Sequence, residues 1–445
     1  MAGIAGIARP AKTVEVNRML DRIAHRGRAV REVFEADGVT MGAVAPSPQT
    51  TAISRPHAAV RDYAGYGHYA QAQILHDRLA LIRDPLGVAP LYYGQTTDGA
   101  LCFASEVKAL IGVARNITEL PPGSFYDGQR VDPHFRLEPR PPLKETPEQI
   151  AIELGVRLGD AVQKCVHPDL FGAWLSGGLD SSALVALARP RTKALHTFAG
   201  GVAGAPDLQY ARTVAEFVGT EHHETVVSLE DMLRVLPDVI YHLESFDALL
   251  VRSSIVNFMV AKQASEYVPA VLSGEGGDEL FAGYEYLKSL AREQLSAELL
   301  DITSRLHNTA LQRVDRCASA HGLVAHTCFL DPPVVDLALR IPVEFKLRGT
   351  VEKWILRQPL RGLLPESVLE RTKSKFWQGA GVGELLATHA ERTISDSDFR
   401  QERILPNGWI LNSKEELLYY RFFREQFREI GDLGWMGRTK NAPRS

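Results

Sequence analysis

The chain has 445 residues, of which 45% are hydrophobic and 23% charged, and its formal net charge is −4. This composition is typical of a globular protein of two or three domains, and the weak net charge excludes a general attraction to nucleic acid or to anionic membranes. No run of about eighteen apolar residues is present, and no charged-then-apolar signal peptide opens the chain. We therefore expect a cytoplasmic protein without a membrane span.

The cysteine pattern also indicates a reducing compartment. The four cysteines are widely scattered, and no two form a CxxC pair, which argues against a zinc site or a disulfide framework. We expect them to be small buried hydrophobic residues in a reducing compartment. They are Cys102, Cys165, Cys317 and Cys328.

The first part of the chain alternates short apolar runs with turns. Residues 73–94 predict a strand, a turn and a strand, and residues 99–110 predict a strand followed by a helix. The proline-rich segment 136–149 is typical of a linker. These patterns predict a β-rich domain over residues 1–140.

A helix is expected to begin directly after this linker. Thr146, Pro147 and Glu148 follow one another as a cap, a first-turn proline and an early acid, which is typical of a helix start. We place the domain boundary near Pro141, so the second domain covers residues 141–445.

The second domain alternates strands with helices up to about Ser289 and is mostly helical after it. Alternation of this kind predicts an α/β fold with a parallel sheet covered by helices. The expected strands are 171–176, 194–200, 221–227 and 269–274, and the expected helices between them are 180–188, 207–219 and 254–267.

The most informative segment is "FGAWLSGGLDSSALVALA", which starts at Phe171. An apolar strand leads into Ser-Gly-Gly-Leu-Asp-Ser-Ser and then into a helix, which places small residues, hydroxyls and free N–H groups at a helix N-terminus. Such a loop binds anions, and it lacks the lysine of the common P-loop. The segment resembles the pyrophosphate loop of the ATP-pyrophosphatases, which cleave ATP between the α and β phosphates.

A second segment, "VLSGEGGDELFAGYEY", repeats the arrangement of an apolar strand followed by small and acidic residues. Asp180 of the first segment and Asp278 of the second then follow two strands of one sheet, at the edge where ligands bind. Two carboxylates there suit Mg²⁺ on a triphosphate. The alternative is that each aspartate only caps a helix.

Together these segments resemble the class B, glutamine-type asparagine synthetases over nearly the whole chain. "LALIRDPLGVAPLYYG", "LCFASEVKAL" and "LPPGSFY" are similar to the back half of the glutaminase domain of that family. "DVIYHLESFD", "FLDPPVVDLALRIP" and "VEKWILRQPLRGLLPESVLERTKSKF" are similar to its synthetase domain. The resemblance implies an N-terminal Ntn-hydrolase-like remnant and a C-terminal ATP-pyrophosphatase domain, with ATP and Mg²⁺ as cofactors.

The resemblance also implies roles for individual residues. Asp180 and Asp278 match the metal carboxylates, Glu275 matches the acid that handles protons when ammonia attacks, and Lys353 matches the lysine that steadies the phosphate. The residues that match the ATP site are Leu175, Ser176, Gly178, Asp180, Ser181, Ser182, Gly200, Ser273 and Gly274. The implied reaction is adenylation of a carboxylic acid, followed by attack of a nitrogen nucleophile to give an amide and AMP.

The first domain departs from the family in the residues that hydrolyse glutamine. Ala2 stands where the nucleophilic cysteine is expected, and a methyl group cannot attack glutamine. The Asn-Gly-Glu and Gly-Asp-x-Glu segments have no match between Gly27 and Leu75, and the domain has about 140 residues against roughly 200 expected. We expect a glutaminase-inactive scaffold that offers a homodimer face, with nitrogen from ammonia, from an amine, or from a separate glutaminase acting in trans.

The acid pocket departs from the family as well. Leu249 and Leu250 replace two threonines, while Arg252 is kept. The family's Glu-x-Arg-x-Pro segment is replaced by residues 324–328, which include His326, and a Phe-Ser-Asp-Gly-Val-Gly segment is replaced by residues 376–381, which include Gln378. Aspartate would leave polar groups unpaired in such a pocket. We expect Leu249, Arg252, His326 and Gln378 to contact a larger, less polar carboxylic acid, in specialised metabolism.

Other functions fit the sequence less well. β-Lactam synthetases also lack the cysteine but carry tyrosine where this chain has Glu275, and lasso-peptide cyclases diverge further in the matching segments. An ammonia-dependent asparagine synthetase is the alternative if aspartate is accepted. A nucleotide-binding pseudoenzyme is disfavoured by the intact loops and Lys353, and a tRNA-thiolating enzyme by the lack of reactive cysteines and a basic surface.

Overall fold

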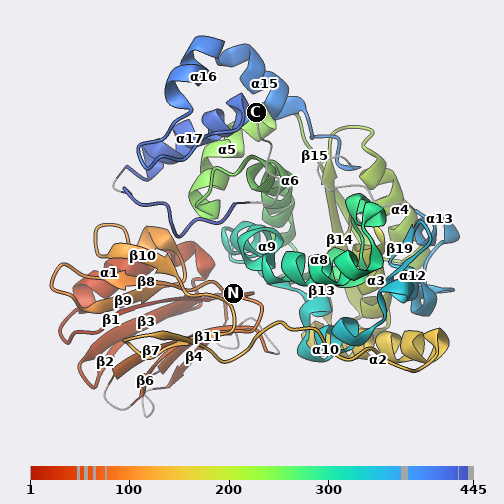
Figure 1. The fold of residues 1–445 in the computed structure, drawn as a ribbon, viewed down its shortest axis with the longest axis horizontal. Helices are drawn as coiled ribbons and strands as arrows, with labels where there is room; N and C mark the ends of the chain where they lie inside the picture. Colours follow the sequence, from red (N-terminus) through yellow and green to blue (C-terminus); the bar gives the residue numbers. More distant parts are fainter. Residues whose placement is uncertain are drawn as a thin grey trace.

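The N-terminal part of the chain folds into antiparallel β-sheets (Figure 1). The computed structural model describes residues 2–47, 51–54, 59–63, 67–75, 78–371, 379–428 and 430–438. Within these ranges one sheet has the order β10-β8-β9-β1-β3-β2, with β1 Gly3–Ile7, β2 Val30–Ala36, β3 Val39–Ala45, β8 Tyr92–Gln95, β9 Leu101–Ala104 and β10 Arg115–Glu119.

A second antiparallel sheet faces the first. Its order is β12-β11-β7-β6-β5-β4, with β4 Thr51–Ser54, β5 Ala59–Tyr63, β6 Tyr69–Leu75, β7 Arg78–Arg83, β11 Ser124–Tyr126 and β12 Val131–Pro133. The β-rich prediction for this part is confirmed. Helix α1 (Thr13–Arg22) was not predicted. It packs on β1 and β3 through Val16, Met19 and Leu20, which are buried.

The C-terminal part contains the predicted parallel sheet, which confirms the α/β fold class. The described strands have the order β15-β14-β13-β16-β17, and all adjacent pairs are parallel. The bounds are β13 Leu170–Trp174, β14 Ala194–Gly201, β15 Glu221–Val226, β16 Ala270–Leu272 and β17 Val324–His326. The last strand was not predicted, because three residues are too few to give a period.

Helices cover both faces of this sheet, as alternating side chains require. On β14, Leu195 packs into the cluster shared with α2, α3 and α4, whereas Phe198 packs into the cluster shared with α5, α6 and α9. The helix bounds are α2 Pro147–Cys165, α3 Leu179–Ala188, α4 Pro206–Val218, α5 Leu229–Leu243, α6 Ala248–Ser265 and α9 Ala310–Ser319.

Shorter helices complete the fold, and α15, α16 and α17 lie at the top of Figure 1, where α17 packs against α5. In the part of the chain that the structure describes, no helix is both long and apolar enough to cross a bilayer. The remaining α-helices in the described ranges are α7 Gly277–Phe281, α8 Arg292–Ser304, α10 Pro332–Arg340, α11 Val343–Lys346, α12 Trp354–Arg357, α13 Glu366–Leu369, α15 Leu385–Thr393, α16 Asp396–Glu402 and α17 Lys414–Gln426.

The predicted helix start after the linker is confirmed. Thr146 caps α2 in a capping box, in which its hydroxyl accepts from the Gln149 N–H and the Gln149 side chain accepts from the Thr146 N–H at 3.0 Å. Residues 134–146 form neither helix nor strand. The domain boundary near Pro141 lies in this segment and stays a prediction.

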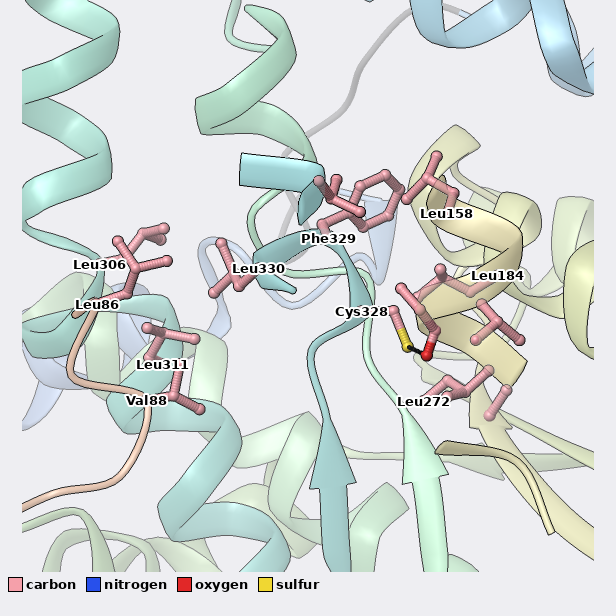
Figure 2. Close-up of a cluster of buried hydrophobic side chains, with 14 of the residues drawn as sticks. Leu86, Val88, Leu158, Leu184, Leu272, Leu306, Leu311, Cys328, Phe329 and Leu330 are labelled. Atoms are coloured by element: carbon pink, nitrogen blue, oxygen red, sulfur yellow. Dashed lines mark hydrogen bonds between the residues drawn. The ribbon is translucent and has the colours of Figure 1, made fainter. Parts of the chain in front are cut away.

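One hydrophobic core joins the two parts of the chain. Leu86 and Val88, from a loop of the β-rich part, pack beside Leu306 and Leu311 of the C-terminal part (Figure 2). Because this contact is apolar and buried, the two parts are not independent bodies joined only by a linker.

A buried ionic network crosses the same interface. The guanidinium of Arg26 contacts Glu106 at 2.6 Å and Asp315 of α9 at 2.7 Å, and its Nε donates to the Ala2 carbonyl at 2.6 Å. Arg316 contacts Glu106 at 3.0 Å. Burial alone would raise the pKa of Glu106, but its neighbours His25, Lys108 and Arg316 hold it well below its usual range. Helix α9 is thereby anchored to the β-rich part by charge.

The network predicts that Arg26→Ala lowers the free energy of unfolding by about 3–5 kcal/mol, because Glu106 and Asp315 lose a buried cation. Chemical denaturation of the full chain measures this change. The matched control is Arg31→Ala, which removes an exposed pair with Asp21 and should cost less than about 1 kcal/mol. Equal effects of the two substitutions would contradict the account of the interface.

Candidate functional site

A cavity of about 390 Å³ opens at the carboxyl ends of the central parallel strands. Trp174 and Leu175 line it at the end of β13, Phe198 and Gly200 at the end of β14, and Ser273 directly after β16. This is the edge at which parallel sheets bind ligands, and the volume suits a small molecule. The sequence analysis placed both glycine-rich loops at this edge, and both line the cavity.

The first loop presents hydroxyl and amide groups at the start of α3. Ser176 and Ser181 lie within hydrogen-bond distance of each other, with 3.2 Å between their Oγ atoms, and the N–H of Gly178 donates to Ser176. Ser182 is fully buried behind them, and its Oγ has no hydrogen-bond partner among the described residues. Hydroxyls and amides at a helix N-terminus form a binding site for phosphate oxygens.

Lys353 joins the two glycine-rich loops. Its Nζ lies 2.5 Å from an oxygen of Asp180 and 2.6 Å from an oxygen of Asp278, and the lysine side chain is 3% exposed. Its backbone is left-handed, with φ of 53°. Gly283 permits the approach, because a Cβ there would lie 2.2 Å from the lysine Cε. The two carboxylates therefore converge on one cationic centre.

This arrangement fits a divalent cation that is only partly held by protein. The described residues contain no cluster of three or more histidine, cysteine, aspartate or glutamate side chains suited to a metal. Asp180 and Asp278 supply two hard oxygen donors side by side. Mg²⁺ favours one or two carboxylates and takes its other ligands from water and phosphate.

Glu275 also lines the cavity, and an arginine holds it there. The guanidinium of Arg313, on α9, forms an ion pair with the Glu275 carboxylate, and both side chains line the cavity. Arg313 lies on the helix that Arg26 and Glu106 anchor at Asp315 and Arg316. The position of Glu275 therefore depends on a helix that the β-rich part holds in place.

A second acidic group lies deeper in the same cavity. Burial, followed by the charge of Asp278, raises the pKa of Glu279 to about 7. The Tyr284 hydroxyl donates to Glu279 at 2.5 Å, and both residues line the cavity. This wall of the site is thus acidic and desolvated.

Most of the residues predicted for the site come together here. Those that line the cavity are Leu175, Ser176, Gly178, Asp180, Ser181, Gly200, Leu249, Ser273, Gly274, Glu275 and Asp278. Lys353 and Ser182 lie behind that surface, the first bound to the carboxylates and the second buried under the loop. Gln378 lies outside the described residues.

Two of the residues predicted to bind substrate lie elsewhere. Arg252 is on α6, where it forms an ion pair with Glu415 of α17, and neither Arg252 nor His326 lines the cavity. Glu415 also accepts from the Tyr419 hydroxyl at 2.7 Å. The His326 ring lies 6.0 Å from that of Phe171 in β13. Contact of Arg252 and His326 with a substrate stays a prediction.

Several cavity residues were not predicted from the sequence. Arg313 lies on α9, Arg305 and Thr309 lie between α8 and α9, and Tyr284 and Tyr286 follow the second loop. None of them belongs to a glycine-rich motif, and helical spacing does not show which face of α9 meets the sheet. The two tyrosines could have been predicted to lie near the site, because they come within three residues of the end of "GGDELFAG".

Comparison with known proteins identifies the family. The asparagine synthase family model matches residues 153–301 and 288–441, and the glutamine amidotransferase domain model matches residues 64–126. Glutamine-hydrolysing asparagine synthetase from Triphysaria versicolor is 34% identical over 373 residues, which cover 78% of this chain and 63% of that protein. The chain thus spans less than two thirds of the length of that relative.

Two further relatives are covered more fully. Asparagine synthetase B of Escherichia coli K12 is 34% identical over 391 residues, 82% of this chain and 70% of that protein. The probable glutamine-hydrolysing asparagine synthetase of Schizosaccharomyces pombe is 34% identical over 409 residues, 82% of this chain and 73% of that protein. With these matches and the family model over most of its second part, the chain belongs to the asparagine synthase family.

Proposed function

We propose that this chain is an ATP-dependent, AMP-forming amide synthetase that adenylates a carboxylic acid other than aspartate and transfers the acyl group to ammonia or a small amine. The observation that carries the proposal is the convergence of three groups on one cavity. These are the hydroxyls of the first loop, the Asp180–Lys353–Asp278 cluster and the arginine-held Glu275. Membership of the asparagine synthase family supports the same reaction class.

The first step needs a bound triphosphate and a carboxylate in line with its α-phosphorus. The loop from Ser176 to Ser182 binds phosphate oxygens through its hydroxyls and N–H groups. A carboxylate oxygen of the acid attacks the α-phosphorus, the bond to the bridging oxygen breaks, and pyrophosphate leaves. Lys353 stabilises negative charge on the phosphoryl oxygens. Asp180 and Asp278 would hold Mg²⁺, which would supply positive charge that neutralises the triphosphate.

The second step needs a group that accepts a proton from the nitrogen nucleophile. The nitrogen attacks the acyl carbon, the bond to the phosphate oxygen breaks, and AMP leaves. Glu275 lines the same cavity, and Arg313 fixes its carboxylate. We assign to Glu275 the proton released as the amide forms.

The acid is expected to have a larger and less polar body than aspartate. Leu249, Leu250 and Val260 line the cavity from α6, and Phe198 and Ala199 line it from β14. These five side chains offer no hydrogen bond, so a polar group placed against them would lose its solvation. An apolar acid would bury its surface there instead. Ser253 and Asn257 also line the cavity from α6 and leave polar partners for the carboxylate end of the acid.

We propose that the nitrogen does not come from glutamine bound to the β-rich part. Ala2 is fully buried and has no nucleophilic group, and the Arg26 Nε occupies its carbonyl oxygen. The segments that bind glutamine in the family are missing from the sequence. Free ammonia, an amine, or ammonia from a separate glutaminase then remains as the source.

The adenylation step predicts ATP–pyrophosphate exchange that depends on an acid and needs no nitrogen source. We expect exchange with at least one apolar or aromatic acid, and weak or no exchange with aspartate, because of the leucine-lined wall. The assay uses the full chain with a panel of acids that includes aspartate. Exchange with aspartate alone would instead indicate an ammonia-dependent asparagine synthetase, and no exchange with any acid would contradict the proposed reaction.

The role of Glu275 predicts that the two half-reactions can be separated. Glu275→Gln should keep pyrophosphate exchange within about tenfold of the parent and lose amide formation by about a hundredfold or more. Asp278→Asn is the comparison, since it should lower both activities. If Glu275→Gln lowers exchange and amide formation equally, Glu275 acts in binding and not in proton transfer.

A further inference from the structure

Two cysteines from distant parts of the chain meet behind the candidate site. Cys165 ends α2, and Cys328 begins the short 3-10 helix η7 (Cys328–Leu330) after β17. Their Sγ atoms lie 3.8 Å apart, and no disulfide joins them. The same two segments are held together by an ion pair of 2.8 Å between Lys164 and Asp331.

The two thiols differ in environment. Cys328 is 2% exposed within the hydrophobic core, and Figure 2 shows its sulfur directed at a carbonyl oxygen of α2, that of Ala161. Cys165 is only partly buried. Of the two cysteines, Cys165 is therefore the one that a small solute would meet first.

Cys165 is also the thiol best prepared to react. The neighbouring Cys328 thiol, with a further contribution from the His326 imidazole, lowers the pKa of Cys165 to about 5. Burial raises the pKa of Cys102 and of Cys317 to about 12. The thiolate form is therefore favoured at Cys165 and disfavoured at these two cysteines.

We propose that Cys165 and Cys328 are an oxidation site that closes reversibly to a disulfide when the protein meets a hydroperoxide. The Cys165 thiolate attacks a peroxide oxygen, the O–O bond breaks, and the alkoxide or hydroxide takes up a proton, which leaves Cys165 as a sulfenic acid. The Cys328 sulfur then attacks that sulfur, and the S–O bond breaks. The hydroxide leaves as water with the thiol proton of Cys328.

The geometry requires only a small local movement. Bonded sulfurs lie about 2 Å apart, so the two atoms must approach by roughly 1.8 Å. Cys328 is followed by Phe329 and Leu330, and the Leu330 side chain fills the space beside Gly276, where a Cβ would lie 2.5 Å from it. Gly276 belongs to the loop that carries Glu275 and Asp278. A shift of η7 therefore reaches the candidate site directly.

A second connection runs through β17. The N–H of Ser273, which lines the cavity, donates to the carbonyl of His326 at 2.8 Å, two residues before Cys328. Oxidation at Cys328 should thus displace Ser273 as well as Gly276. This regulatory consequence, unlike the disulfide itself, rests on the proposed adenylation function.

The residues that form this site are among those that set the chain apart from the family it resembles. Residues 324–328 replace Glu-x-Arg-x-Pro, so His326 stands where arginine is expected and Cys328 where proline is expected. Proline at that place has no sulfur, and the thiol pair then could not exist. His326, which stands in place of that arginine, is thus also the imidazole beside Cys165.

The disulfide is tested on the full chain with hydrogen peroxide at pH 7, followed by intact mass and peptide mapping. We expect the mass of the chain to fall by two hydrogen atoms. The peptide map should contain a cross-linked pair that joins Cys165 to Cys328, and dithiothreitol should reverse both changes. Oxidation of Cys165 to sulfinic acid without a cross-link, or a cross-link between other cysteines, would overturn the proposal.

The matched variants are Cys165→Ser and Cys328→Ser, which should abolish the cross-link, and Cys102→Ser and Cys317→Ser, which should leave it unchanged. The wild-type peptide map stays decisive if a variant fails to fold. His326→Gln should slow closure, because the imidazole no longer favours the thiolate. An unchanged rate in His326→Gln would remove the histidine from the proposal, and an unchanged yield in Cys165→Ser would refute the thiol pair.

Regulation is tested separately on the same samples. We expect acid-dependent pyrophosphate exchange to fall by about tenfold to a hundredfold on oxidation, since a displacement of this size misplaces reacting groups, and to return on reduction. Cross-linked protein with unchanged exchange would refute the regulatory role. Absence of exchange in the reduced protein would count against adenylation and leave the cross-linking result standing.

Discussion

The candidate site depends on one buried cation held between two carboxylates. Lys353 draws together Asp180, from the loop after β13, and Asp278, from the loop after β16, with Nζ–O distances of 2.5 and 2.6 Å. Three charged groups taken out of water are stable only when each has its partners. The position of each loop therefore depends on the other. A phosphate ligand that enters between the loops would meet the Lys353 ammonium already in place.

The β-rich part supports the cavity indirectly, because it holds α9 in place. Arg26 and Glu106 hold α9 through Asp315 and Arg316, and Arg313 on the same helix holds Glu275 at the cavity. If the β-rich part does not hydrolyse glutamine, as proposed, it would thus still be required for the candidate site. The apolar contacts of Leu86 and Val88 with the C-terminal part also hold the two parts of the chain together.

Short-range patterns predicted the frame of the fold and the loops of the site. A strand, a glycine-rich turn and a helix are adjacent in sequence, so Ser176, Asp180 and Ser273 were placed correctly from local patterns and the rule for parallel sheets. The contacts of α9 and of Arg252 were not predictable, because they join residues far apart in the sequence, 38 residues from Arg313 to Glu275 and 163 from Arg252 to Glu415. Helix spacing gives the face of a residue but not the element that meets it, and β17 was too short to show a period.

The central claim is that the chain activates a carboxylic acid by adenylation, and isotope transfer tests it most directly. An acid that supports turnover is labelled with ¹⁸O in its carboxylate, and the products are separated after reaction with ATP and a nitrogen donor. The account predicts one ¹⁸O atom in AMP and none in pyrophosphate. Label in inorganic phosphate with formation of ADP would show an acyl-phosphate route and contradict the account.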